Sequence, residues 1–433
     1  MSADSSLSSP SHARAPAPTR YKSLLYMCEY PPSTQAGAPV IAKQLLAEYD
    51  RDRLHVLCCR EQYEKGSPVV RESYLDCAHT TVPAVATIDL RPRRLFVPIK
   101  RSLNCLRIPR ILRQARTIVA KHDVEAIFTI PWRCEFAMAA YRLHQETGLP
   151  LYVFETDDWH SMNPRLLQGS MIRTHREDLL TAATHLWVTS PNMQRRYRER
   201  FGVESDFLFH FVDLDTYQSA TAAVGSRRDA PEVRVVYTGS INRMFYDTMK
   251  TFCDLLNEGL TIDGRPVVMD IYGGGCPSSL EGSNVTYRGL VDLRDIPRIL
   301  ADADLSFVGV SFSKDPEIYE LVKTSLYTKT IDYLASGRPV LVVSPPYTGE
   351  VDYFGEVTHV VTDPSPEAMR DAMEAIIRDP AAAEKKARAG VELVRSHHSL
   401  TSVRDVFLRH FLKSTSARDA EANPKQETPV RIS

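Results

Sequence analysis

Short apolar runs that are rich in β-branched residues recur along the chain, and helical patterns separate them. In the first half these runs lie at 23–27, 54–59, 125–130, 149–155 and 185–190. After a polar stretch the alternation begins again, with runs at 233–239, 267–274, 285–289, 304–310 and 339–343. Strands that alternate with helices are typical of parallel sheets flanked by helices. The pattern therefore predicts an α/β protein made of two consecutive Rossmann-like domains.

The same pattern suggests where each part begins and ends. The expected parts are a disordered tail at 1–20, an N-terminal domain at 21–217, a linker at 218–231, a C-terminal domain at 232–395, a crossing helix at 396–413 and a second disordered tail at 414–433. Both tails are polar and lack the apolar residues needed for a core. In the last helical segment Ser399 is a plausible N-cap, and Val403, Phe407 and Phe411 share an apolar face. We expect this helix to pack back across the two domains.

Composition supports this picture and narrows the possible partners. The 433 residues exceed what one hydrophobic core usually organises, and the net charge of −1 gives no general argument for nucleic-acid binding. Neither a secretory signal nor a run of about 20 apolar residues is visible, so we expect a cytoplasmic protein. The eight cysteines form no CxxC pair and show no zinc-site spacing, so reduced thiols are expected, with no metal and no cofactor.

In open parallel sheets, ligands bind beyond the carboxyl ends of the strands. The run at 233–239 is followed by Gly239, Ser240, Asn242 and Arg243. A glycine lets a ligand approach the backbone, the polar side chains offer hydrogen bonds, and arginine suits a phosphate group. The alternative is an ordinary turn with a solvated arginine. The run at 267–274 ends in a glycine loop that includes Gly273 and Gly274, which fits a nucleotide contact and a tight turn equally well.

The segment 324–343 predicts a helix that runs into a strand. A helix starting near Ser325 places Lys329 and Asp332 on the same face. With Thr328, its N-terminus would favour a diphosphate, because free N–H groups and the helix dipole attract anions. Asp332 could accept hydrogen bonds from ribose hydroxyls. The alternative is a capped helix with a surface ion pair. Because three strand-end features fall at one edge of the same sheet, the nucleoside-diphosphate interpretation is favoured.

Two features of the first half carry further chemistry. Asp157, Asp158 and His160 follow the run at 149–155. One of them could act as general base toward an acceptor hydroxyl, or the carboxylates could cap the next helix, and the sequence does not choose among these roles. The segment 90–122 contains ten Lys or Arg residues and no acid. It predicts a basic amphipathic surface for an anionic membrane or an anionic acceptor, with a solvated helix as the alternative. No aromatic stacking set supports nucleic-acid binding.

The C-terminal half resembles the donor domain of GT-B glycosyltransferases of the group 1, family 4-like type. The resemblance rests on VYTGSINR, IYGGG, VTYRGLVDLRDIPRILADADLSFVGV and SLYTKTIDYLASGRPV. The N-terminal half resembles the acceptor domain, with Gly37 in its flexible loop, and the whole resemblance spans 21–412. It implies that Lys329 meets the donor phosphates and that Asp332 stands where a ribose-binding glutamate usually sits. Thr324 replaces the glutamate usual eight residues earlier, and no second basic residue is evident after Arg243.

These observations predict two domains that face each other across a cleft. The expected activity is a metal-independent, hexosyltransferase-like transfer from a nucleotide-sugar donor to a sugar, lipid-linked or small-molecule acceptor. Synthesis of a cell-surface polysaccharide, glycolipid or glycoconjugate would use such a step. Peripheral attachment to the inner face of the membrane through 90–122 is a further expectation. The alternatives are a sugar-nucleotide epimerase or hydrolase of the same fold and a non-catalytic GT-B-like binding scaffold, which Thr324 keeps open.

Overall fold

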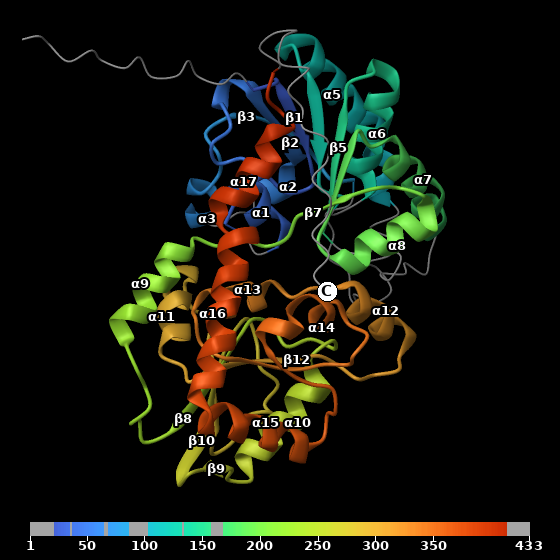
Figure 1. Ribbon diagram of the computed structural model, residues 1–433. Helices are drawn as coiled ribbons and strands as arrows, with labels where there is room; N and C mark the ends of the chain where they lie inside the picture. The colour runs from blue at the N-terminus through green and yellow to red at the C-terminus, as the bar shows by residue number, and fades with distance from the viewer. Residues whose placement is uncertain are drawn as a thin grey trace, which may run out of the picture.

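The computed structural model describes residues 21–34, 37–64, 68–85, 103–131, 134–156 and 168–413. They form two α/β domains, one above the other in the view of Figure 1. The predicted architecture of two Rossmann-like domains is confirmed. Within the described ranges, no helix has both the length and the apolar character that crossing a bilayer requires.

The N-terminal domain is built on a parallel sheet with the strand order β3-β2-β1-β4-β5-β6-β7. Its strands are β1 (Leu24–Met27), β2 (Leu54–Cys59), β3 (Ala78–Val82), β4 (Ala126–Thr129), β5 (Leu151–Glu155), β6 (His185–Val188) and β7 (Asp206–Phe207). Its α-helices are α1 (Ala38–Leu45), α2 (Arg60–Glu64), α3 (Pro68–Glu72), α5 (Ile108–His122), α6 (Cys134–Thr147), α7 (Gln168–Ala182) and α8 (Pro191–Phe201). The five predicted strands are all present, and the sequence pattern missed β3 and β7.

The C-terminal domain has the strand order β11-β10-β8-β12-β13-β14, with the short β9 antiparallel to β10. Its strands are β8 (Val233–Thr238), β9 (Thr261–Ile262), β10 (Arg265–Tyr272), β11 (Val285–Gly289), β12 (Leu305–Gly309), β13 (Val340–Val343) and β14 (His359–Val361). Its α-helices are α10 (Tyr246–Asn257), α11 (Ile296–Ala301), α12 (Pro316–Thr324), α13 (Thr328–Ala335), α14 (Gly349–Phe354), α15 (Pro366–Arg378) and α16 (Pro380–His397). Helix α9 (Leu214–Val224) joins the domains, so the first part of the expected linker is helical.

Side chains on both faces of each sheet are buried, as expected for strands covered by helices. In β1, Leu25 and Met27 pack with α5 and α6, whereas Leu24 and Tyr26 pack with α1 on the other face. This alternation follows from the two-residue period of a strand. The C-terminal sheet is covered in the same way, by α10 and α15 on one face and by α9, α13 and α16 on the other.

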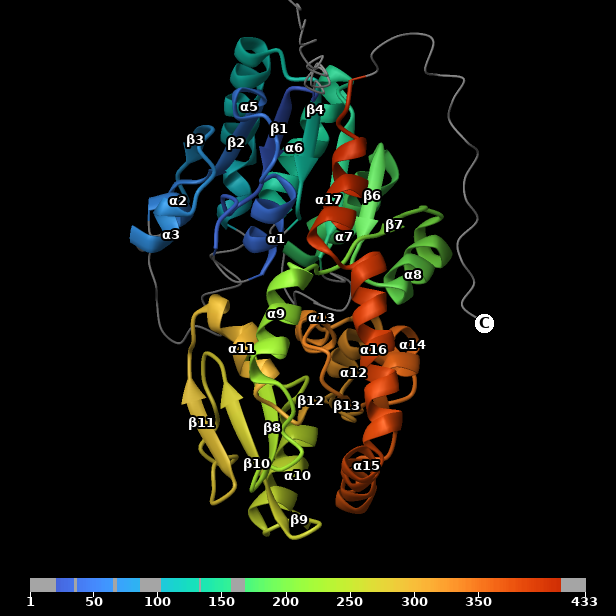
Figure 2. The same cartoon turned by 60° about the vertical axis from the view of Figure 1, so that its left-hand side comes forward.

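The last two helices lead the chain from the C-terminal domain back to the N-terminal domain. Helix α16 packs on the C-terminal domain, and α17 (Leu400–Arg409) lies along the N-terminal domain beside β6 (Figure 2). Ser399 caps α17 by accepting a hydrogen bond from the backbone N–H of Ser402. Phe407 and Phe411 join the core that contains Trp187. The C-terminal end of the described chain is therefore part of the N-terminal domain.

The start of α8 joins the two domains by direct hydrogen bonds. The hydroxyl of Ser190 caps α8 and donates to the backbone carbonyl of Thr324, at 2.5 Å. The side-chain amide of Asn192 donates to the carbonyl of Lys323, at 2.9 Å. Two side chains of the N-terminal domain thus donate hydrogen bonds to the backbone carbonyls at the end of α12, in the C-terminal domain.

Candidate active site

Two glycines bring the ends of β8 and β10 into close contact. The N–H of Gly239 donates to the carbonyl of Tyr272, at 2.7 Å, and a Cβ on Gly273 would lie 2.2 Å from the Gly239 oxygen. Gly239 has φ 116°, in the left-handed region that favours glycine. Ser240 and Gly274 lie beside them, since a Cβ on Gly274 would be 3.9 Å from Ser240 Oγ. The prediction that these two loops share one edge of the sheet is confirmed.

Lys329, in the first turn of α13, extends its side chain to this edge. A Cβ on Gly239 would lie 3.5 Å from Lys329 Cε and 3.7 Å from its Nζ. The ammonium group donates to the Tyr237 hydroxyl and lies 4.0 Å and 3.9 Å from the ring centroids of Tyr237 and Phe245. Burial among these rings lowers the pKa of Lys329 to about 7. A phosphate at this edge would favour the charged form of this amine.

Glu350, at the start of α14, is the residue of this region that the sequence did not reveal. Its carboxylate is fully buried and accepts hydrogen bonds from the backbone N–H of Tyr327, at 3.2 Å, and from the Thr330 hydroxyl. Burial raises its pKa to about 7, although these two hydrogen bonds and the Lys329 charge act in the opposite direction. Glu350 therefore fixes the first turn of α13. It lies several residues beyond the end of β13, so a search of strand ends passes over it.

The helix around Lys329 begins later than predicted. We expected it to start near Ser325, but α12 ends at Thr324, Ser325 is extended and α13 begins at Thr328. Ser325 therefore does not share a helical face with Lys329 and Asp332, and that prediction is wrong. The break lies where the carbonyls of Lys323 and Thr324 accept hydrogen bonds from the N-terminal domain. The Tyr327 side chain makes no hydrogen bond that caps α13, which leaves the exposed Thr328 at the helix N-terminus.

Asp332 has partners on both carboxylate oxygens. The Tyr217 hydroxyl, from α9, donates to Oδ1, and His210 Nε2 lies 3.6 Å from Oδ2. Both partners belong to the stretch where the chain passes from one domain to the other. Asp332 therefore ties α13 to this connection, and its contact with a ribose stays a prediction.

The polar side chains after β8 are also engaged. Arg243 donates to Glu317 in the first turn of α12, at 2.8 Å, and about half of its side chain is exposed. Asn242 Oδ1 accepts from the backbone N–H of Met244, at 2.8 Å, and so stabilises its own turn. Arg243 is thus held beside α12, and a phosphate would compete with Glu317 for it.

The acceptor-side predictions are only partly accessible to the structure. Asp157, Asp158 and His160 lie outside the described residues, so their role as general base stays a prediction. Gly37 precedes α1 with φ 87°, a conformation that requires glycine.

The described half of the basic segment differs from the predicted amphipathic surface. In α5 the apolar side chains of Ile108, Ile111 and Ile118 pack in the domain core, so they are not available to a membrane. Arg107 is buried and pairs with Glu135 at 2.6 Å. The exposed basic side chains of this helix are Arg110, Arg113, Arg116 and Lys121, of which Arg116 is paired with Glu146. The outer face of α5 is basic and polar, but the apolar side chains of Leu103 and Leu106, just before this helix, are exposed. Residues 90–102 lie outside the described ranges.

Residues 251–408 match a family described as "Glycosyl transferase-like". No curated protein sequence matches the chain.

Solved structures are similar over almost the whole chain. Sucrose-phosphate synthase from Thermosynechococcus elongatus superposes with a TM-score of 0.66 at 15% identity, covering 93% of this chain and 100% of that one. HepE from Anabaena, in complex with UDP and glucose, has a TM-score of 0.61 at 13% identity, covering 90% and 99%. α,α-Trehalose 6-phosphate synthase from Burkholderia multivorans has a TM-score of 0.60 at 13% identity, covering 94% and 100%. The chain therefore has the GT-B fold, and residues 251–408 are similar to the glycosyl transferase-like family.

Proposed function

We propose that this protein transfers a sugar from a nucleoside-diphosphate sugar, held by the C-terminal domain, to an acceptor hydroxyl. The observation that carries the proposal is the position of Lys329. This residue lies in the first turn of α13, and its side chain brings the ammonium group to the glycines at the ends of β8 and β10. A cation, a helix N-terminus and exposed backbone at one sheet edge form a suitable site for a diphosphate. The match of residues 251–408 to a glycosyl transferase-like family supports this assignment.

In this proposal the protein stabilises the nucleoside diphosphate that leaves when the bond between the sugar's anomeric carbon and the diphosphate oxygen breaks. Lys329 and the N–H groups at the start of α13 neutralise the developing negative charge, and Arg243 adds a second cation when it exchanges Glu317 for phosphate. These groups would do the work that a divalent ion does in other transferases, so we propose metal-independent transfer. A base from Asp157, Asp158 or His160 would take the acceptor proton.

The donor and acceptor classes are also proposals. HepE was solved with UDP and glucose, which makes UDP-hexoses the first donors to test. We propose a sugar, lipid-linked or small-molecule acceptor, with the exposed cations of α5 and residues 90–102 holding the protein near an anionic surface. The proposed setting is the cytoplasmic side of a membrane.

The deciding experiment measures binding and product together. Calorimetry with UDP, GDP, ADP and TDP identifies the nucleotide, and mass spectrometry of reactions with the matching sugar nucleotide and a panel of acceptors follows the product. A glycosylated acceptor supports transfer. An epimerised donor or free sugar without transfer would indicate an epimerase or hydrolase, and binding without turnover would indicate a scaffold.

A further inference from the structure

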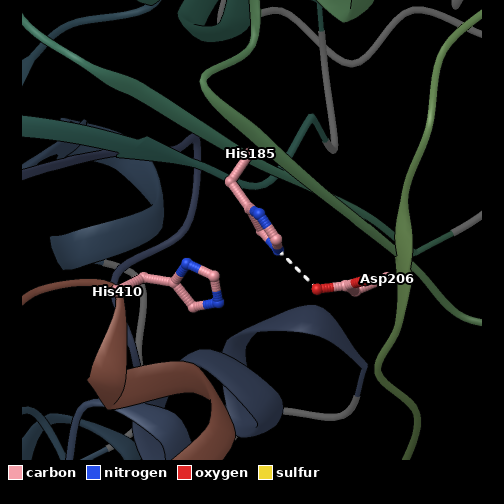
Figure 3. A group of neighbouring side chains, drawn as sticks. All are labelled: His185, Asp206 and His410. Carbon is pink, nitrogen blue, oxygen red and sulfur yellow. Dashed lines mark ion pairs between the residues drawn. The ribbon is translucent and has the colours of Figure 1, made fainter. Parts of the chain in front are cut away.

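Two histidines and an aspartate meet in the N-terminal domain, away from the strand ends discussed above. His185 is the first residue of β6, Asp206 is the first residue of β7, and His410 directly follows α17 (Figure 3). Since β6 and β7 are parallel, their first residues lie at the amino-end edge of the sheet. The group is therefore at the opposite edge from the loops that follow these strands.

The nitrogen and oxygen atoms of these three side chains converge. His185 Nε2 lies 3.1 Å from Asp206 Oδ2, and one ligand atom from each residue lies within 4.8 Å of the other two. The ring centroids of His185 and His410 are 3.9 Å apart. His185 Nε2 is buried and has no hydrogen bond of acceptable geometry to any described residue, despite the nearby carboxylate. The contact with Asp206 is therefore an ion pair with poor hydrogen-bond alignment, and an ion shared by the two side chains would bind both atoms.

The surrounding contacts hold the three residues in place but leave room for adjustment. The backbone carbonyl of His410 accepts from Lys22 Nζ, at 3.0 Å, and from the Tyr152 hydroxyl, at 3.1 Å. The His410 ring stands edge-on to Trp187, with centroids 5.1 Å apart. In contrast, 59% of the Asp206 side chain is exposed, so its carboxylate can rotate and solvent can reach the group.

We propose that His185, Asp206 and His410 bind a divalent transition-metal ion such as Zn²⁺, with water completing the coordination. Two imidazole nitrogens and a carboxylate oxygen are ligands that Zn²⁺ accepts, at about 2.0–2.2 Å from the ion. Ligand atoms around a tetrahedral ion are then about 3.4 Å apart, so a small rotation of Asp206 or His410 completes the site. An ion here would also replace the poorly aligned contact between His185 Nε2 and Asp206 with a bond to each.

Such an ion would act on the fold and not on the transfer reaction. It would join the end of α17 to β6 and β7, from which the whole C-terminal domain separates it in the sequence. Since the unfolded chain does not bring these ligands together, binding stabilises the folded state. With one carboxylate, and with the Lys22 ammonium near His410, the site neutralises only part of the ion's charge. We therefore expect reversible binding that a chelator removes.

The experiment uses the full chain, free of any affinity tag and stripped with a chelator. Calorimetric titration with ZnCl₂ should show one saturable equivalent that Asp206→Asn and His410→Ala each weaken at least tenfold. His175→Gln is the matched control, because His175 and Asp178 are partly exposed and 3.6 Å apart, and no third ligand joins them among the described residues. The control should bind Zn²⁺ like the native protein.

Two further measurements make the outcome unambiguous. Zn²⁺ should raise the melting temperature of the native protein and of His175→Gln, but not that of Asp206→Asn. Asp206 is exposed, so this variant should fold even if His410→Ala does not, and circular dichroism checks the fold of each. The proposal is overturned if no saturable binding occurs, or if a folded Asp206→Asn binds Zn²⁺ with native affinity.

Discussion

The side chain of Lys329 lies against Gly239, with Cε 3.5 Å from the position that a Cβ on this glycine would occupy. This contact joins the first turn of α13 to the end of β8, two elements that come close only in the folded domain. It brings a cation, a helix N-terminus and a glycine backbone together, as the proposed diphosphate site requires.

We predict that Lys329→Ala weakens binding of the cognate nucleoside diphosphate by about tenfold or more, because a hydrogen bond to a charged group contributes about 1.5–3 kcal/mol. Calorimetry measures the effect. Lys385→Ala, on the exposed side of α16, is the control and should bind normally. Native affinity in a folded Lys329→Ala protein would refute the assignment.

Neighbouring glycines should respond very differently to alanine. A Cβ on Gly273 would overlap the backbone oxygen of Gly239 at 2.2 Å, whereas a Cβ on Gly274 would meet only Ser240 Oγ at 3.9 Å. Overpacking of this kind typically costs about 1–3 kcal/mol. We expect Gly273→Ala to lower the free energy of unfolding in urea by at least that much and Gly274→Ala to leave it nearly unchanged. Equal losses in the two variants would contradict this geometry.

Lys329 and Glu350 should give stability an unusual pH dependence. The raised pKa of Glu350, about 7, means that the folded state keeps a proton that the unfolded state releases, so this group makes stability fall from about pH 4.5 to 7. The lowered pKa of Lys329, about 7, means that the folded state releases a proton first, so stability rises from about pH 7 to 10.5.

Urea unfolding at a series of pH values tests this prediction by difference. Subtracting the Lys329→Met curve from the native curve should leave a rise above pH 7, and subtracting the Glu350→Gln curve should leave a fall below it. A flat difference curve would show that the residue titrates equally in the folded and unfolded states.

Two variants distinguish between a structural role and a ribose-binding role for Asp332. If it only ties α13 to α9, Asp332→Asn and Tyr217→Phe should each reduce stability, couple in a double-mutant cycle and bind nucleotide alike. If it also binds ribose, Asp332→Asn should weaken nucleoside-diphosphate binding by about 1.5–3 kcal/mol while inorganic pyrophosphate binding is unchanged. We expect the second result. Identical nucleotide affinity of the two variants would show that Asp332 does not contact the ribose.

Membrane attachment through α5 should depend on charge, because the apolar side chains of this helix are buried in the core. We expect the native protein to co-sediment with anionic vesicles at low ionic strength and to be released by salt. Arg110→Glu/Arg113→Glu/Lys121→Glu should weaken sedimentation, and Arg93→Glu/Arg94→Glu/Lys100→Glu/Arg101→Glu tests the preceding stretch. A native protein that remains in the supernatant at low salt would exclude this attachment.

Local patterns in the sequence were sufficient for the fold. Most of the apolar runs became buried strands, because a parallel strand covered on both faces carries its signal in its own residues. The run at 285–289 is the exception, since only Val285 of β11 is buried. The strand β7 has only two residues, and β3 reads AHTTV with one buried side chain, so neither carries such a signal.

The site was less predictable because its geometry depends on residues distant in sequence. Glu350 fixes α13 across a strand and a turn, and Ser190 reaches from the other domain to the end of α12. Helical periodicity in the sequence cannot show that side chains of the other domain donate hydrogen bonds to the carbonyls of residues 323 and 324. The break in the helix before Thr328 was therefore missed. His185, Asp206 and His410 show no motif spacing for the same reason.

The packing of α17 has a consequence for synthesis of the protein on the ribosome. Phe128 on β4 and Trp187 on β6 obtain Phe407 and Phe411 as neighbours only after the whole C-terminal domain and α17 have been made. Domains usually fold in the order in which they emerge. Here the domain that emerges first cannot complete its core until the last helix has left the exit tunnel, so the C-terminal domain can reach its final packing earlier than the domain that precedes it.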